Sequence, residues 1–323
     1  MLNIIRKIAP TFLLVGMIAT SGCASPATPA PPEASIAGEQ TTEPETPAAT
    51  PGIIETNTNE EPTAQNNTDD FDWNDETMDP SDIPDDMLPP LEGSIFEVLK
   101  YYPVNLLQLS PPAPGEELVT LHTSMGDITM RLFPEEAPMA VENFLTHARN
   151  GYYDDVIFHR VIPEFMIQTG DPEGTGMGGE SIWGEPFWLE PSFNLRHFRG
   201  ALAMAHAGGA MNSQFYIVQN TDIGFEFMQE LSGIIDDQDF PIGIFEDGTR
   251  LYIRDVFLTE EIEYFKTHGG TPHLDWLWNQ QGHTVFGHVV SGMDVVDAIA
   301  NAEASQSRPY EDIIIHSISF TTN

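Results

Sequence analysis

The chain has 323 residues, of which 41% are hydrophobic and 10% aromatic, and its formal net charge at pH 7 is −38. That apolar content is sufficient for at least one sizeable buried core. Nucleic acid is excluded as a partner, because phosphate-backbone binding needs clustered Lys and Arg, and this chain has 12 of them against 50 Asp and Glu. Its single cysteine excludes an intramolecular disulfide and a cysteine-based metal site.

The first 22 residues are predicted to be an export signal peptide. Arg6 and Lys7 precede an apolar run at 8–19 that is too short to cross a membrane comfortably. The run is followed by Ser21, Gly22 and Cys23, which resembles the lipobox of bacterial lipoproteins. The resemblance implies lipidation of Cys23, anchoring to the cell membrane and an extracytoplasmic location. The alternative is an ordinary cleaved signal with an incidental cysteine.

Two segments separate the signal from the folded domain. Residues 23–92 are rich in Pro, Thr, Ala, Glu, Asp and Asn, and no Lys or Arg occurs between Lys7 and Lys100. Such a stretch cannot bury enough apolar surface to offset its ordering entropy, so it is predicted to be a disordered acidic tether. Residues 93–116 are more apolar. We expect them to be a connecting segment that packs on the domain.

The domain is predicted to span residues 117–323. Alternating apolar residues at 118–123 and 128–133 predict a hairpin around Gly126. Apolar residues three and four apart predict a helix from Pro138 to Asn150. Further elements are expected as strands at 156–161, 165–169, 201–205, 214–219, 285–290 and 313–321 and a helix at 293–300. Many strands with two separated helices favour a mainly β fold, a closed antiparallel barrel capped by two helices.

Residues 221–270 differ from the rest of the domain. Acidic residues alternate there with aromatic and aliphatic ones, and 260–268 has a helical pattern. We interpret this stretch as an insertion with some core of its own.

Four ordered motifs point to a family. Residues 158–171 read FHRVIPEFMIQTGD, and AMAHAG, NSQFYI and GHTVFG follow at 203–208, 212–217 and 282–287. In content and order they resemble the cyclophilin-type peptidyl-prolyl cis-trans isomerases. The resemblance implies a cyclophilin-like β-barrel and an enzyme that interconverts the cis and trans forms of X-Pro bonds.

The chemistry of that reaction limits what the site needs. Amide resonance opposes the rotation with a barrier of roughly 18–20 kcal/mol, and no covalent bond is broken. The catalyst therefore needs a dry pocket for the proline ring and a donor aimed at the charge that develops as resonance is lost. No cofactor is expected. No metal site is expected either, because none of the 10 histidines is spaced with carboxylates as zinc ligands usually are.

The resemblance assigns roles residue by residue. Arg160 would hydrogen-bond the prolyl nitrogen, and Gln168 would orient Arg160. The implied catalytic residues are Arg160, Phe165, Gln168 and His283; the implied substrate-binding residues are Met166, Ala205, His206, Gln214, Tyr216, Leu274 and Trp278. Taken without the resemblance, an arginine on a strand more often faces solvent, and neighbouring Phe and Met side chains more often belong to a core.

Three positions depart from the family pattern. His206 stands where asparagine is common, and Tyr216 stands where phenylalanine is usual, so that a hydroxyl would enter the pocket floor. The wall residue expected before His283 could be Leu274 or Trp278, since one of them has been displaced by extra residues.

The expected partners are proline-containing polypeptides, in particular exported proteins during folding, and the chain is expected to be a monomer. The main alternative is a non-catalytic module that binds proline peptides and recruits clients through the insertion at 221–270. A surface adhesin on a stalk is the third possibility, but it would not require intact groove residues.

Overall fold

The computed structural model of the chain describes three long stretches, residues 103–224, 238–275 and 282–323. It also describes shorter pieces, namely residues 79, 83–85, 88, 91, 99–101, 229 and 233. The predicted export signal, Cys23, nearly all of the tether and Trp278 lie outside the described residues. The described residues belong to one compact unit.

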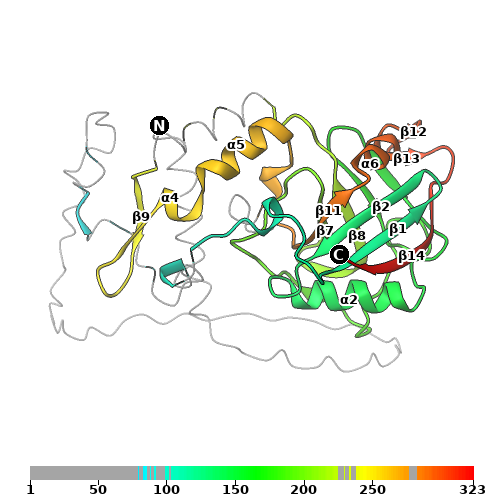
Figure 1. Ribbon diagram of the computed structural model, residues 1–323, viewed down its shortest axis with the longest axis horizontal. Coiled ribbons are helices and arrows are strands. Elements are labelled where there is room, and N and C mark those ends of the chain that lie inside the picture. Colours follow the sequence, from blue (N-terminus) through cyan, green and yellow to red (C-terminus); the bar gives the residue numbers. More distant parts are fainter. Residues whose placement is uncertain are drawn as a thin grey trace, which may run out of the picture. The chain divides into compact units, whose positions relative to one another are not determined.

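A single curled antiparallel sheet dominates the fold (Figure 1). Its strands are β1 (Glu117–Thr123), β2 (Gly126–Leu132), β3 (Val156–Ile157), β4 (Arg160–Ile162), β5 (Met166–Thr169), β6 (Phe187–Trp188), β7 (Ala201–Ala207), β8 (Ala210–Val218), β11 (Val285–Ser291) and β14 (Ile314–Thr322). They pair in the order β3-β14-β1-β2-β11-β7-β8-β5-β4, and β6 pairs with β8. The protein is therefore mainly β, as predicted. The pairing does not confirm a closed barrel, because the ladder ends at β3 and β4.

The structure refines several predicted elements. The strand expected at 156–161 is two short strands, because β3 pairs with β14 whereas β4 pairs with β5. Strands β7 and β8 are longer than predicted and are joined by Gly208 and Gly209. The φ angles of these two residues are 61° and 88°, a conformation that is unfavourable for residues with a side chain. A further short ladder joins β12 (Ala304–Ser305) to β13 (Arg308–Pro309).

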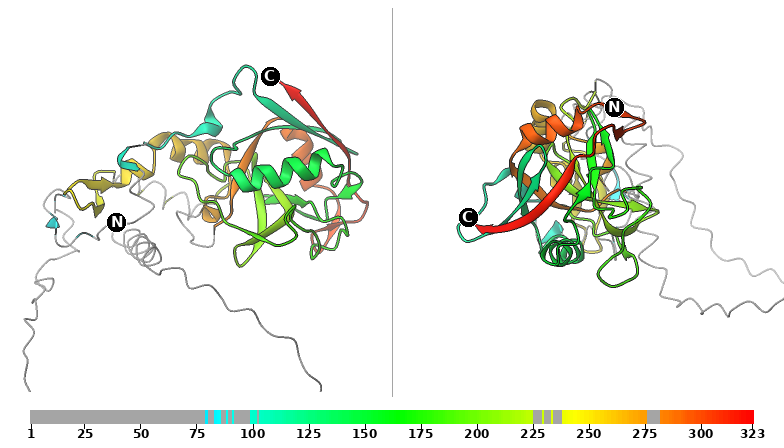
Figure 2. Two further views of the ribbon diagram at one scale, coloured as in Figure 1. Left: turned by 90° about the horizontal axis from the view of Figure 1, so that it is seen from below. Right: turned by 90° about the vertical axis from the view of Figure 1, so that its right-hand side faces the viewer.

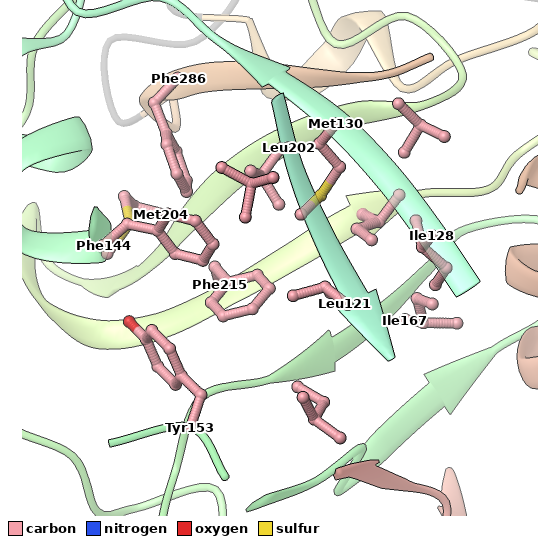
Figure 3. Close-up of a cluster of buried hydrophobic side chains, with 14 of the residues drawn as sticks. Leu121, Ile128, Met130, Phe144, Tyr153, Ile167, Leu202, Met204, Phe215 and Phe286 are labelled. Carbon is pink, nitrogen blue, oxygen red and sulfur yellow. The ribbon is translucent and has the colours of Figure 1, made fainter. Parts of the chain in front are cut away.

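The main core lies on one face of the sheet. Alternate residues of the strands point to this face, since side chains of a strand project to opposite sides in turn. Figure 3 shows Leu121, Met130 and Phe215 among the side chains that fill it. Helices α2 (Pro138–Arg149) and α6 (Met293–Ala300) cover opposite ends of the curled sheet (Figures 1 and 2), and both contribute buried side chains to this core. Each buries an apolar face, so both predicted helices are present.

Residues after β8 form a separate group of elements. They are β9 (Pro241–Ile244), β10 (Arg250–Tyr252), α4 (Ile253–Val256), α5 (Thr259–His268) and η5 (Pro272–Leu274). Helix α5 matches the helical pattern seen in the sequence. Its buried Glu261 forms an ion pair with Arg196, and its Phe265 ring lies 4.6 Å from that of Phe198. This helix is thus tied to the segment that leads into β7.

The connecting segment also contacts the sheet. Gln108, in η4 (Leu107–Leu109), donates through Nε2 to the Arg196 carbonyl and accepts the Arg196 backbone N–H. Arg131 on β2 holds the carbonyls of Leu107 and Ser110. In the described stretches, no helix has the length and apolar character that crossing a bilayer requires.

Candidate active site

One row of residues crosses five strands on the face opposite the main core. Arg160 pairs with Gln168, Gln168 with Tyr216, Tyr216 with Ala203, and Ala203 with Val285. Directly paired residues project to the same face of a sheet. The row therefore gathers a cation, an amide, a phenol and two small apolar side chains that lie far apart in sequence.

Hydrogen bonds order the polar end of this row. Arg160 Nη1 donates to Gln168 Oε1 over 3.1 Å, and Gln168 Nε2 donates to Gln214 Oε1 over 2.9 Å. Gln214 Nε2 in turn donates to the Gly178 carbonyl over 2.8 Å. Each amide uses its oxygen and its nitrogen, so its orientation is fixed. The chain places Arg160, whose side chain is exposed, in a defined position at the edge of the row.

The loop that carries Gly178 is itself held. The Asp171 carboxylate accepts four backbone N–H groups, from Glu173, Thr175, Gly176 and Gly178. Such a ring of donors around one buried carboxylate fixes the loop backbone. The glycine-rich loop beside the row is therefore anchored at its base.

An apolar site patch lies next to Arg160. We define it as the buried residues Met166, Ala203, Tyr216 and Val285 with the half-buried Phe165, Ala205 and Leu274. The Arg160 guanidinium carbon lies 5.9 Å from the centre of the Phe165 ring. Half-buried members keep part of their apolar surface accessible, which is what a site for a proline ring requires.

His283 forms one side of the patch. Its ring meets the Tyr216 ring edge to face at 5.3 Å, and its Nδ1 contacts the Met204 carbonyl at 3.0 Å. Because a carbonyl can only accept, Nδ1 carries the proton. Burial, reinforced by nearby histidines including His206, lowers the pKa of His283 to about 4. The ring is therefore neutral at neutral pH.

His206 is brought beside His283, with 4.0 Å between the ring centres. Its Nδ1 accepts the Gly209 N–H, and its Nε2 contacts the Gly282 carbonyl at 3.2 Å. Both ring nitrogens thus have partners within the protein. A contact of His206 with a peptide backbone through a ring nitrogen would require breaking one of these bonds.

The Tyr216 hydroxyl corrects a sequence expectation. It does not enter the pocket floor as a free polar group but lies 3.0 Å from Nε2 of the fully buried His197. His197 Nδ1 lies 2.6 Å from Asp275 Oδ1. Sequence analysis missed both residues. The signal that could have found them is the tyrosine itself, since a buried hydroxyl needs a hydrogen-bond partner.

Of the two candidates for the wall residue before His283, the structure describes Leu274, whereas Trp278 lies outside the described residues. Leu274 belongs to the site patch, and its carbonyl accepts the His283 N–H over 3.0 Å. The preceding His273 stacks on the Phe165 ring with 6.1 Å between centres. All described candidate residues therefore lie around one patch.

In the part of the chain that the structure describes, no three His, Cys, Asp or Glu side chains are grouped as metal ligands. The site offers instead a fixed cation, oriented amides and an apolar surface. These groups can bind a peptide and stabilise a developing negative charge or lone pair.

Comparison with known proteins places this site in a family. A family model described as "Cyclophilin type peptidyl-prolyl cis-trans isomerase/CLD" matches residues 118–236 and 254–320, more than half of the chain. The chain belongs to the cyclophilin-type peptidyl-prolyl cis-trans isomerase family. It is accordingly an isomerase of X-Pro bonds, as its motifs predicted. The residues left unmatched between the two ranges include β9 and β10.

Individual cyclophilin-type relatives are also similar. A putative peptidyl-prolyl cis-trans isomerase of Staphylococcus saprophyticus is 43% identical over 217 residues, which are 66% of this chain and 97% of the relative. One of Staphylococcus aureus is 43% identical over 206 residues, covering 63% of this chain and 91% of the relative. A crystal structure of a Cryptosporidium parvum cyclophilin is 28% identical and covers 64% of this chain and 98% of its own, with a TM-score of 0.46.

Proposed function

We propose that Arg160 accelerates rotation of the X-Pro bond by donating a hydrogen bond to the prolyl nitrogen while the proline ring lies on the site patch. The observation that carries the proposal is the bond from Arg160 to Gln168 at the edge of this patch. A guanidinium has five N–H donors in a fixed fork, and Gln168 uses one of them. Another can face a bound peptide.

The physical reason lies in the change of charge during rotation. In the planar amide the nitrogen lone pair is delocalised, and in the twisted state it is localised on nitrogen. A donor that meets this lone pair binds the twisted state more tightly than either planar state, which lowers the barrier. The apolar patch strengthens the effect because it excludes water from one side of the bond.

The test compares two arginines that each lie over an aromatic ring. Arg160→Ala should lower kcat/KM for a short X-Pro peptide by about a hundredfold, the usual effect of losing a transition-state donor. Arg149→Ala is the control, since Arg149 lies 5.1 Å from the Phe320 ring and pairs with Glu117 away from the site. Rates would be measured by NMR exchange with the purified full chain.

Equal activity of Arg160→Ala and the parent would refute the arginine mechanism. Loss of activity in both variants would point to a general effect on folding. If the parent itself did not accelerate exchange, the alternative of a non-catalytic proline-peptide module with client recruitment through 221–270 would take its place.

We further propose that the substrates are exported proteins and that Cys23 anchors the enzyme to the membrane by a lipid. The support is in the sequence: two basic residues, an apolar run at 8–19 and then Cys23, followed by an acidic tether. Labelled palmitate should be incorporated into the chain expressed in a bacterium and not into Cys23→Ser. Equal labelling of both would overturn the anchor.

A further inference from the structure

We propose that Asp275, His197 and Tyr216 form a positioning relay that fixes the floor of the site patch against its wall and thereby sets affinity for the proline ring. The inference rests on the proposed function of this site. We call the three residues the floor relay. None of the three touches the reacting bond in the mechanism above, so the relay acts through the position of the Tyr216 ring.

The geometry of the relay is continuous. Asp275 Oδ1 lies 2.6 Å from His197 Nδ1, and His197 Nε2 lies 3.0 Å from the Tyr216 hydroxyl. The His197 and Tyr216 rings are nearly parallel, with 17° between their planes. All three side chains are at least 95% buried. Hydrogen bonds in such surroundings are costly to break because water cannot replace them.

The direction of each hydrogen bond follows from these contacts. A carboxylate accepts, so His197 donates from Nδ1 to Asp275. The other ring nitrogen, Nε2, then accepts the Tyr216 O–H. Burial and the nearby Asp275 charge raise the pKa of Tyr216 well above its ordinary value of 10, so the phenol stays protonated. Every hydrogen of the relay thus has one acceptor.

The same aspartate also holds the wall. Asp275 Oδ1 accepts the backbone N–H of His197 over 2.8 Å, and the Thr271 N–H donates to the His197 carbonyl over 2.8 Å. Asp275 directly follows the patch residue Leu274, whose carbonyl accepts the His283 N–H. One carboxylate therefore ties the floor ring, the η5 wall and His283 to a common segment.

That segment is itself clamped on both sides of His197. Arg196 forms the buried ion pair with Glu261 of α5, and Phe198 packs on Phe265 of the same helix. His197 is therefore held in place, because the residues before and after it both contact α5, a helix outside the sheet. Because the segment that carries His197 is rigidly supported, the hydrogen bonds of the floor relay can hold the Tyr216 ring in one position, which mobile surface hydrogen bonds could not do.

A positioning role predicts a particular kinetic change. The Tyr216 ring contacts a proline ring equally in planar and twisted states, so loosening it weakens both. Uniform loss of binding raises KM and leaves kcat unchanged, whereas loss of a transition-state donor lowers kcat. The relay and Arg160 should therefore affect different constants.

The experiment measures kcat and KM of the full chain from a concentration series of an X-Pro peptide. Tyr216→Phe removes only the hydroxyl and should raise KM about three- to tenfold, the range expected for one buried hydrogen bond. Tyr153→Phe is the matched control, because it removes a buried hydroxyl that donates to the Ser213 carbonyl beside the main core. Tyr153→Phe should leave KM unchanged, and thermal unfolding would show that both variants fold.

A double-mutant cycle tests whether the three residues act as a unit. Asp275→Asn should raise KM as Tyr216→Phe does, and the double variant should be no worse than either single variant. If Asp275→Asn does not fold, His197→Gln takes its place in the cycle. A parental KM in Tyr216→Phe, an equal rise in Tyr153→Phe, a fall in kcat alone, or multiplicative effects in the double variant would each overturn the relay. An inactive parent would instead overturn the proposed function.

Discussion

Replacing Glu261 with glutamine tests how α5 is held on the rest of the protein. The Glu261 and Arg196 side chains are 2% and 1% exposed, and two N–H groups of the guanidinium reach the two carboxylate oxygens at 2.6 and 3.0 Å. The remaining guanidinium bonds go to the carbonyls of Phe193, Leu195 and Val256. Burial raises the pKa of Glu261, and the Arg196 charge opposes that shift.

The loss of unfolding free energy in Glu261→Gln follows from the unpaired guanidinium that the substitution leaves in the core. The amide has only one acceptor for two guanidinium donors, and the Arg196 charge loses its counter-ion in a buried place. Breaking a buried pair in this way costs about 3–5 kcal/mol. The three carbonyls still solvate part of the charge, so we expect the lower end, about 3 kcal/mol. For a domain of this size that corresponds to a fall in Tm of about 6–12 °C.

The assay is thermal and urea unfolding, with hydrogen exchange of residues 253–268 to detect local release of α4 and α5. Glu263→Gln is the control on the same helix, since Glu263 is exposed and pairs with Lys266 three residues later. It should cost less than about 0.5 kcal/mol. Equal effects of the two variants would refute the reasoning, as would a double variant of Arg196→Met and Glu261→Leu that is less stable than Glu261→Gln.

Two further predictions concern acid stability and the glycine-rich loop. Burial lowers the pKa of His288 from 6.5 to about 4. As pH falls from 6.5 toward 4, the unfolded chain therefore binds a proton that the folded chain does not. The free energy of unfolding should therefore fall by up to about 3 kcal/mol over this range. In urea unfolding at pH 7 and 4.5, His288→Gln should lose less of this free energy than the parent does. An equal loss in the variant and the parent would contradict this prediction. Asp171→Ala should raise KM about threefold or more with little change in kcat, because the loop carrying Gly178 loses its anchor and releases Gln214; a parental KM in peptide isomerisation would argue against this role.

Much of the site was predictable because its polar end is local in sequence. Arg160 and Gln168 lie eight residues apart in one motif, whose resemblance to the family assigned both to the site, and the register of β4 on β5 places them directly opposite each other. The helix at Pro138 was likewise readable from its apolar spacing and its proline. The division of the strand at 156–161 was not, because apolar composition does not reveal where a ladder is interrupted.

The sequence by itself determined the class of protein, since four ordered motifs resemble those of the cyclophilin-type isomerases and the family model matches the same region. Only the tertiary structure decided where the Tyr216 hydroxyl goes, because His197 and Asp275 come from segments 78 residues apart. It likewise decided that both ring nitrogens of His206 contact groups within the protein and that Arg196 is buried with Glu261. The physical reason is common to all three. A buried polar group must find its partner wherever the packed chain brings one, and sequence spacing does not record that position.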